Sequence, residues 1–328
     1  MKPDPSFSRE VDSPLSEGPG ASGGLADITV LIPVYECADR MDEHRKLMRK
    51  LAPLIGEMLW VATRSIDGSH ELARQAAKET GGEYLEVPPG LYAAWNAGIT
   101  KASRRYLYIS TVGEEISVEG LSSMRSLMMQ WEADICFSPP RIEPESAPAL
   151  RATRHWPIFR FERNLRQYRN RVVPVPLLAR LQVLSGISCL LGSCASCIFR
   201  TAVFHRNPFP VDYGHYGDTV WWHQNLVSAK TIYHSNVISS FHVHDFSQRT
   251  IRRQDLEQCL EILIFDYQNR FPNSYLPVWA RQLQNSRDRL DNLRGAHPAR
   301  FWWLDPRAWF WRTRRSWIQL KILNFRFC

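Results

Sequence analysis

The first half of the chain alternates between short apolar runs and longer stretches with helical periodicity. Residues 28–35 form an almost unbroken run of apolar and β-branched side chains, the pattern of a strand covered on both faces. Helical spacing follows over residues 41–54. The alternation continues to about residue 138, with strands predicted at 58–63, 84–87, 106–110 and 134–137 and helices from 69, at 92–102 and at 121–131. This order predicts a doubly wound, mainly parallel α/β sheet that binds ligands at the carboxyl ends of its strands.

The alternation stops after residue 140. Residues 151–180 carry eight Arg residues among aromatic ones and a single acid, Glu162. Such a segment could bind nucleic acid, although solvated arginines are the commoner explanation of the pattern. A strand is then predicted at 193–199, followed by helices at 219–226, 255–268 and 277–293.

The two ends of the chain differ from its middle. Residues 1–26 are rich in Pro, Ser and Gly and are predicted to form a disordered tail. Residues 27–250 are predicted to form the α/β domain, and residues 251–328 a helical region. Residues 301–328 hold five of the 12 Trp residues among Arg and Lys, which suits either a membrane-interface segment or a tail packed on the domain.

Composition narrows the class of protein. The 328 residues carry a net charge of +8, which favours anionic partners without choosing between them. No apolar run approaches the roughly 18–20 residues that span a bilayer, and the polar start has no signal-peptide pattern. The seven Cys residues are predicted to be reduced thiols. Cys189, Cys194 and Cys197 could be zinc ligands, but the sequence favours buried residues on a strand.

Four short segments at the ends of predicted strands or in neighbouring helices carry the candidate chemistry. They read IPVY at residues 32–35, SIDGS at 65–69, AWNAGI at 94–99 and YGDT at 216–219. In this order and spacing they resemble the family-2 glycosyltransferases of the GT-A fold over roughly residues 28–245. The resemblance implies the GT-A fold, here with a C-terminal helical extension, and a nucleoside-diphosphate sugar as donor.

Two of these segments offer nucleotide contacts on physical grounds. Tyr35 can present an aromatic face to a base, and Asp67 can accept the N–H of its imide. The resemblance implies the same roles, with Pro33 and Val34 shaping the turn. The segment after the second strand is also an ordinary turn with a helix cap, and both roles can hold together.

The third segment lies in a helix that the resemblance places below the donor. It implies that Asn96 and Gly98 are donor-site residues. Trp95 stands where the family usually has an Arg, which puts one polar contact to the donor in doubt.

The predicted metal site departs from the family pattern. The strand at 106–110 corresponds to the strand that normally ends in an Asp-x-Asp metal motif, but this chain continues with TVGEE. Glu114 or Glu115 can supply a hard oxygen ligand to Mg²⁺ or Mn²⁺, and the alignment favours Glu114. The alternative is a solvated acidic turn before a helix that starts near Ser117. His244, after a strand expected to end at Phe241, is a secondary metal candidate by resemblance.

Asp218 is the candidate catalytic base. Displacement at an anomeric carbon with inversion needs one carboxylate to take the proton of the acceptor hydroxyl. Asp218 occupies the position from which the family draws that base. An N-cap on the following helix is an equally natural local role.

The resulting hypothesis is an inverting glycosyltransferase that moves a sugar from a UDP-linked donor to a hydroxyl of a carbohydrate or lipid-linked acceptor. The Arg-rich excursion would line the acceptor side, and the Trp-rich tail would hold the enzyme on the cytoplasmic face of the membrane, as in cell-envelope polysaccharide synthesis. Two alternatives stay open: a catalytically silent GT-A domain, and a basic nucleic-acid-binding protein. The nucleic-acid-binding alternative ranks last because it leaves the strand-end carboxylates without a role, so no nucleic acid is expected as a partner.

Overall fold

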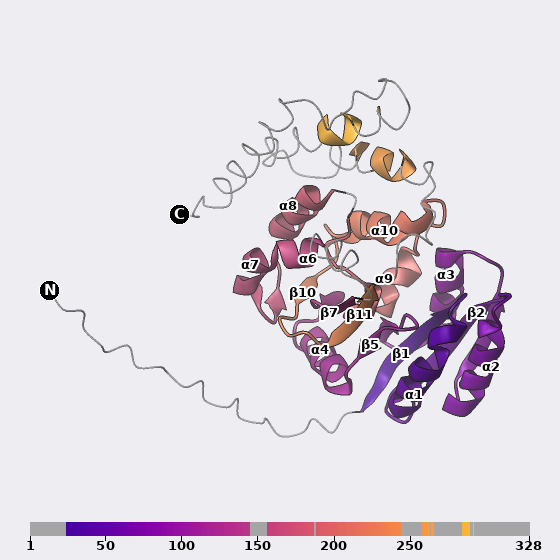
Figure 1. Ribbon diagram of the computed structural model, residues 1–328. Helices are drawn as coiled ribbons and strands as arrows, with labels where there is room; N and C mark the ends of the chain where they lie inside the picture. Colours follow the sequence, from indigo (N-terminus) through magenta and orange to yellow (C-terminus); the bar gives the residue numbers. More distant parts are fainter. Residues whose placement is uncertain are drawn as a thin grey trace, which may run out of the picture.

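The fold is organised by one large sheet. The computed structural model describes residues 24–144, 156–186, 188–243, 257–262, 264–265, 284–288 and 291. The sheet's strands are β1 (Leu25–Val34), β2 (Ile55–Thr63), β3 (Glu83–Val87), β4 (Tyr106–Ile109), β6 (Ile135–Phe137), β8 (Arg171–Val172), β9 (Cys197–Arg200) and β10 (Thr231–Tyr233). Their order is β3-β2-β1-β4-β9-β6-β10-β8, and the pairs among β1 to β4 and between β6 and β10 are parallel. The paired strands β1 and β2 can be followed in Figure 1. β9 runs antiparallel between β4 and β6, and β8 is antiparallel at the edge. The predicted doubly wound, mainly parallel sheet is confirmed.

Helices cover both faces of this sheet because side chains along each strand alternate between the two. Ile28, Val30 and Ile32 of β1 pack on one face and Leu31 on the other, and all four are fully buried. The first face is covered by α1 (Met41–Leu51), α2 (Ser69–Thr80) and α4 (Val118–Gln130). The second is covered by α3 (Leu91–Lys101), α8 (Val175–Ser185), α9 (Thr201–Arg206) and α10 (Gly217–Asn225).

A second, small sheet was not expected from the sequence. It has the order β5-β11-β7, with β5 (Glu115–Ile116), β11 (Ser239–Val243) and β7 (Arg141–Pro144). β11 continues to Val243, so His242 lies within the strand and the predicted end at Phe241 is wrong. Strands this short carry too few residues for a period-two pattern, and only their distant partners define them.

Two strand boundaries also differ from the expectation. β1 begins at Leu25, inside the predicted tail, because Leu25 is buried against the same face as the rest of the strand. The strand expected at 193–199 opens instead as a 3₁₀ turn, η3 (Cys194–Ser196), and β9 runs only over Cys197–Arg200. α4 begins at Val118, close to the expected start near Ser117, and the Ser117 hydroxyl caps it by accepting the Gly120 N–H at 2.9 Å.

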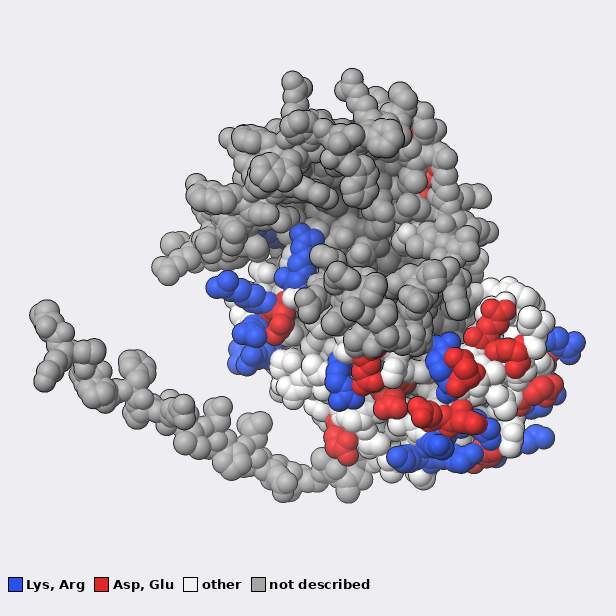
Figure 2. Space-filling model, viewed as in Figure 1, with Lys and Arg blue, Asp and Glu red and all other residues white. Residues whose placement is uncertain are grey.

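The described part of the Arg-rich excursion is an amphipathic layer on the second face. On that face lie α6 (Pro157–Arg160), α7 (Glu162–Leu165), η2 (Arg166–Tyr168) and α8, whereas β8 is the edge strand of the large sheet. Its apolar side chains, such as Ile158 and Leu165, are fully buried, while Arg163, Arg166 and Arg169 are exposed. Figure 2 shows basic and acidic side chains interspersed over the described part of that view. The exposed arginines fit the solvated explanation, and the acceptor-side role stays a prediction.

The remaining regions are described only in part. The described residues of the predicted C-terminal helices, 257–262, 264–265, 284–288 and 291, are helical. Residues 1–23 and the Trp-rich tail at 301–328 lie outside the described residues. Within the part of the chain that the structure describes, no helix has the length and apolarity to cross a bilayer. The described cysteines are all free thiols.

Candidate functional site

The carboxyl ends of β1 and β2 lie side by side and carry the first two predicted contacts. Tyr35 follows β1 and is 54% exposed, whereas Val34 is buried in the core and Pro33 pairs with Val61 of β2. Pro33 and Val34 therefore define where the strand ends and Tyr35 emerges. Asp67 follows β2 in an exposed turn. This edge thus presents an aromatic ring and a carboxylate to the outside.

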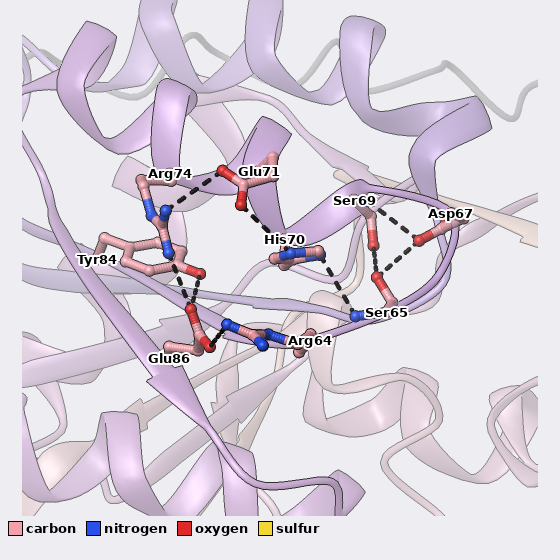
Figure 3. Close-up of polar contacts among 9 residues, drawn as sticks. All are labelled: Arg64, Ser65, Asp67, Ser69, His70, Glu71, Arg74, Tyr84 and Glu86. Carbon is pink, nitrogen blue, oxygen red and sulfur yellow. Dashed lines mark hydrogen bonds and ion pairs between the residues drawn. The ribbon is translucent and has the colours of Figure 1, made fainter.

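The Asp67 carboxylate is held by three protein donors, two of which, Ser65 and Ser69, are drawn in Figure 3. Its Oδ1 accepts the Ser65 hydroxyl at 2.7 Å and the Ser69 N–H at 3.1 Å. Its Oδ2 accepts the N–H of Ala38, which lies just beyond β1, at 3.0 Å. Desolvation opposes ionisation, but these hydrogen bonds outweigh it and lower the pKa of Asp67 to about 2. The N-cap of α2 is Gly68, so the expected cap role falls one residue after Asp67. The Asp67 carboxylate accepts the N–H of the first helical residue and is a fixed, ionised acceptor.

His70 supports this turn and was not found from the sequence. Its Nδ1 accepts the Ser65 N–H at 3.3 Å, and its Nε2 lies 3.4 Å from a carboxylate oxygen of Glu71 (Figure 3). These contacts assign the N–H to Nε2. His70 thus fixes the same residue whose hydroxyl holds Asp67. The only signal in the sequence is a His directly after the DGS turn, and without the fold it does not indicate that the side chain contacts Ser65.

Asn96 and Gly98 have packing roles in the structure. The Asn96 side chain donates to the Phe209 carbonyl at 2.7 Å and accepts the Phe209 N–H at 3.0 Å. A Cβ at Gly98 would lie 2.3 Å from the Leu31 side chain and 2.7 Å from that of Val61. Asn96 therefore anchors the segment around Phe209, and Gly98 lets α3 approach the sheet closely. Their assignment as donor-site residues stays a prediction.

Tyr92 joins the candidate base to the carboxyl end of β3. The Tyr92 ring packs so closely on Gly217 that a Cβ built there would lie 2.4 Å from the ring carbons. The Tyr92 hydroxyl donates to the His215 carbonyl at 3.2 Å. Tyr92 opens α3 just after β3, so it brings the start of α10 to the edge that carries Asp67. Sequence reasoning did not find it, because Tyr92 and Gly217 are far apart in the chain.

Asp218 is a partly buried carboxylate in the first turn of α10. The N-cap of α10 is Tyr216, so the expected N-cap role of Asp218 is wrong by two residues. Its Oδ1 accepts the Thr219 N–H at 2.6 Å. Burial raises the pKa of Asp218 above its ordinary value, and hydrogen bonding by Thr219 offsets only part of that rise. A carboxyl group with a raised pKa is a stronger base once ionised.

The loop after β4 separates the two predicted metal ligands. Glu114 is 6% exposed, and its Oε2 accepts the Ser193 hydroxyl at 2.6 Å. Glu115 is exposed and belongs to β5, paired with Ser240 of β11. The two neighbours therefore point into different environments, and the enclosed carboxylate is Glu114.

The wider set of metal candidates does not converge. Among the described residues, no three His, Cys, Asp or Glu side chains lie close enough together to hold a metal ion. Cys189, Cys194 and Cys197 form no such group; Cys197 is buried and the other two are partly buried. His244 lies outside the described residues, and its neighbour His242 pairs with Glu143 at 3.1 Å. A divalent ion here would have one hard protein oxygen, from Glu114, and would need further ligands from a substrate and water.

Comparison with known proteins identifies the fold. The chain is similar to S. aureus TarS residues 1–349, solved in complex with UDP-GlcNAc, with a TM-score of 0.54 and 12% identity over 81% of this chain and 72% of that one. It is also similar to the mannosyltransferase PcManGT from Pyrobaculum calidifontis, solved with GDP-Man and Mn²⁺, with a TM-score of 0.53 and 14% identity over 92% of this chain and 84% of that one. No sequence family and no curated protein matches the chain. The chain therefore has the predicted GT-A fold, and its structural neighbours are GT-A glycosyltransferases. Membership of family 2 stays a prediction.

Proposed function

We propose that this protein is an inverting glycosyltransferase that uses a UDP-linked sugar. The observation that carries the proposal is a pair of carboxylates at one edge of the sheet whose pKa values are shifted in opposite directions. The pKa of Asp67 is lowered, which suits a permanent hydrogen-bond acceptor, and that of Asp218 is raised, which suits a proton acceptor. Environments that shift the pKa values of two carboxyl groups in opposite directions commonly mark different roles in one site.

The acceptor capacity of Asp67 supports uracil as the base. An ionised carboxylate has about four lone-pair sites, and protein donors occupy both of those on Oδ1 and one on Oδ2. Among the described residues, these three hydrogen bonds leave one site, which matches the single imide N–H of uracil. Guanine presents two adjacent N–H groups and would leave one without an acceptor, at a cost in binding. The exposed ring of Tyr35 beside it offers a face for stacking.

In the proposed reaction, Asp218 accepts the proton of the acceptor hydroxyl. The hydroxyl oxygen forms a bond to the anomeric carbon, while the bond between that carbon and the diphosphate oxygen breaks. The electron pair of the breaking bond leaves with the diphosphate, and attack from the opposite side inverts the anomeric configuration. A well-placed base contributes typically 10²–10⁴-fold to such a step.

We further propose that Glu114 contributes a ligand to Mg²⁺ or Mn²⁺. Support comes from its hard oxygen, its fixed position against Ser193 and its place after β4. The ion, when bound, would neutralise charge on the leaving diphosphate. Glu115 is exposed on the small sheet, which makes it the weaker candidate, and His244 is retained as a further one.

The acceptor and the location are proposed from charge and composition. The exposed arginines of the excursion suit a phosphate-bearing or acidic acceptor, which fits the synthesis of a cell-envelope polysaccharide. The Trp- and Arg-rich residues 301–328 would bind the anionic face of a membrane. Liposome sedimentation of the full chain and of a chain ending at residue 300 tests this location.

A ligand panel followed by an activity assay tests the central proposal. We expect UDP to raise the melting temperature more than GDP, and Mn²⁺ to increase that shift, since binding to the folded state stabilises it by mass action. UDP-sugars should then show slow hydrolysis in the presence of the protein. Binding without hydrolysis or transfer would favour a silent GT-A domain, and equal shifts by UDP and GDP would contradict the role of Asp67.

A further inference from the structure

A guanidinium lies over the loop that follows β4. Arg40 ends the short turn η1 (Ala38–Arg40), just beyond the carboxyl end of β1. A Cβ built on Gly113 would lie 3.2 Å from Arg40 Cδ and 3.4 Å from Arg40 Nη1. Gly113 also has a φ of +92°, which side chains disfavour. Glycine at position 113 therefore meets two needs: it adopts this backbone conformation, and it leaves space for the arginine.

This loop is the place where the sequence lacks the acidic metal motif. Thr111, Val112 and Gly113 precede Glu114, so a single carboxylate is enclosed there. A diphosphate needs positive charge nearby, and a single protein ligand would hold a metal ion only weakly beside it. The arginine over Gly113 brings a permanent positive charge to this loop.

The segment that carries Arg40 also reaches the base site. The Ala38 N–H donates to Asp67 Oδ2 at 3.0 Å, and two residues later the Arg40 side chain covers Gly113. The segment 38–40 therefore contacts both the predicted base site and the loop after β4. A nucleotide whose base meets Asp67 would have η1 beside it.

We propose that Arg40 binds the diphosphate of the donor. This inference rests on the proposed function, because it assumes a nucleotide whose base is at Asp67. The Arg40 side chain is 31% exposed, so its head group can meet a ligand while its stem packs on the loop. A planar guanidinium matches two phosphate oxygens at once.

Binding of uridine and UDP in EDTA separates this role from loop packing. We expect Arg40→Gln to weaken UDP roughly ten-fold and to leave uridine within about two-fold, because only UDP carries the phosphates. Arg40→Lys should recover part of the UDP affinity. Gly113→Ala keeps every charge but displaces the guanidinium, so it should also weaken UDP more than uridine. Lys46→Gln, which removes an exposed charge from α1, is the control and should change neither.

Each result has a distinct meaning. An unchanged ratio of UDP to uridine affinity in Arg40→Gln overturns the proposal, whether both ligands bind as before or both bind more weakly through a damaged loop. Melting curves of the variants report on that damage. If the parent chain binds neither uridine nor UDP, the proposed function fails first and the inference fails with it. If uridine binds at Asp67 and only the Arg40 effect is missing, the proposed function stands and the inference alone is wrong.

Discussion

Replacing Asp67 by Asn tests the base-recognition site with almost no change of shape. In the parent, every group around the carboxylate is a donor: the Ser65 hydroxyl, the Ser69 N–H and the Ala38 N–H. An Asn side chain has one oxygen and one NH₂ group. If its oxygen keeps Ser65 and Ser69, its NH₂ group faces the Ala38 N–H and the uracil imide, and neither pair can form a hydrogen bond.

The magnitude follows from the bonds that are lost. A hydrogen bond to a charged group contributes about 1.5–3 kcal/mol, and because Asp67 is exposed we expect the lower part of that range. The Kd of UDP should therefore rise roughly ten- to thirty-fold. Loss of the Ala38 bond should lower stability by about 1 kcal/mol, or a few degrees in melting temperature. Glu43→Gln, on the exposed side of α1, is the matched control for loss of a carboxylate.

A chemical variant of the ligand isolates the one bond in question. Calorimetry would compare UDP with N3-methyl-UDP, which lacks the imide N–H, on the parent and on Asp67→Asn. We expect the methyl group to weaken binding to the parent and to have a much smaller effect on the variant, where the bond is already absent. If the parent binds both ligands equally, or if the variant keeps parental UDP affinity while folded, then Asp67 does not read the base.

Three further predictions concern the other side chains of the site. Asp218→Asn should keep UDP-sugar binding and lose transfer by roughly 10²–10⁴-fold, and parental transfer rates in the variant would remove Asp218 from the mechanism. Because the pKa of Asp218 is raised, the activity of the parent should fall on acidification at a higher pH than an ordinary aspartate gives. Glu114→Gln should abolish the Mn²⁺-dependent part of UDP affinity, and Glu115→Gln should change it less; the reverse order would exchange their roles. His70→Ala should raise the KM for UDP-sugar roughly three- to ten-fold with kcat preserved, and His70→Asn, which retains an acceptor, should recover part of the loss; a fall in kcat alone would contradict a role at the base site.

The candidate site was predictable in its residues more than in its contacts. Tyr35 and Asp67 were found because they end buried strands, and the carboxyl ends of parallel strands meet at one edge. The supporting side chains were not found. The Ala38 N–H reaches Asp67 from 29 residues away, and the Ser193 hydroxyl reaches Glu114 from 79 residues away. Such pairs leave no local pattern, because spacing along the chain does not record which loops the fold brings together.

The sequence by itself determined the layered sheet and the helices of the first half. Apolar runs and helical periodicity are local consequences of burial on two faces or on one, so they can be recognised before the fold is known. The tertiary structure alone decided the antiparallel place of β9, the small sheet and the different environments of Glu114 and Glu115. It also decided which side chains support Asp67 and Asp218, and hence the opposite directions of their pKa shifts. Those shifts depend on burial and on donors from distant segments, and both exist only once the chain has folded.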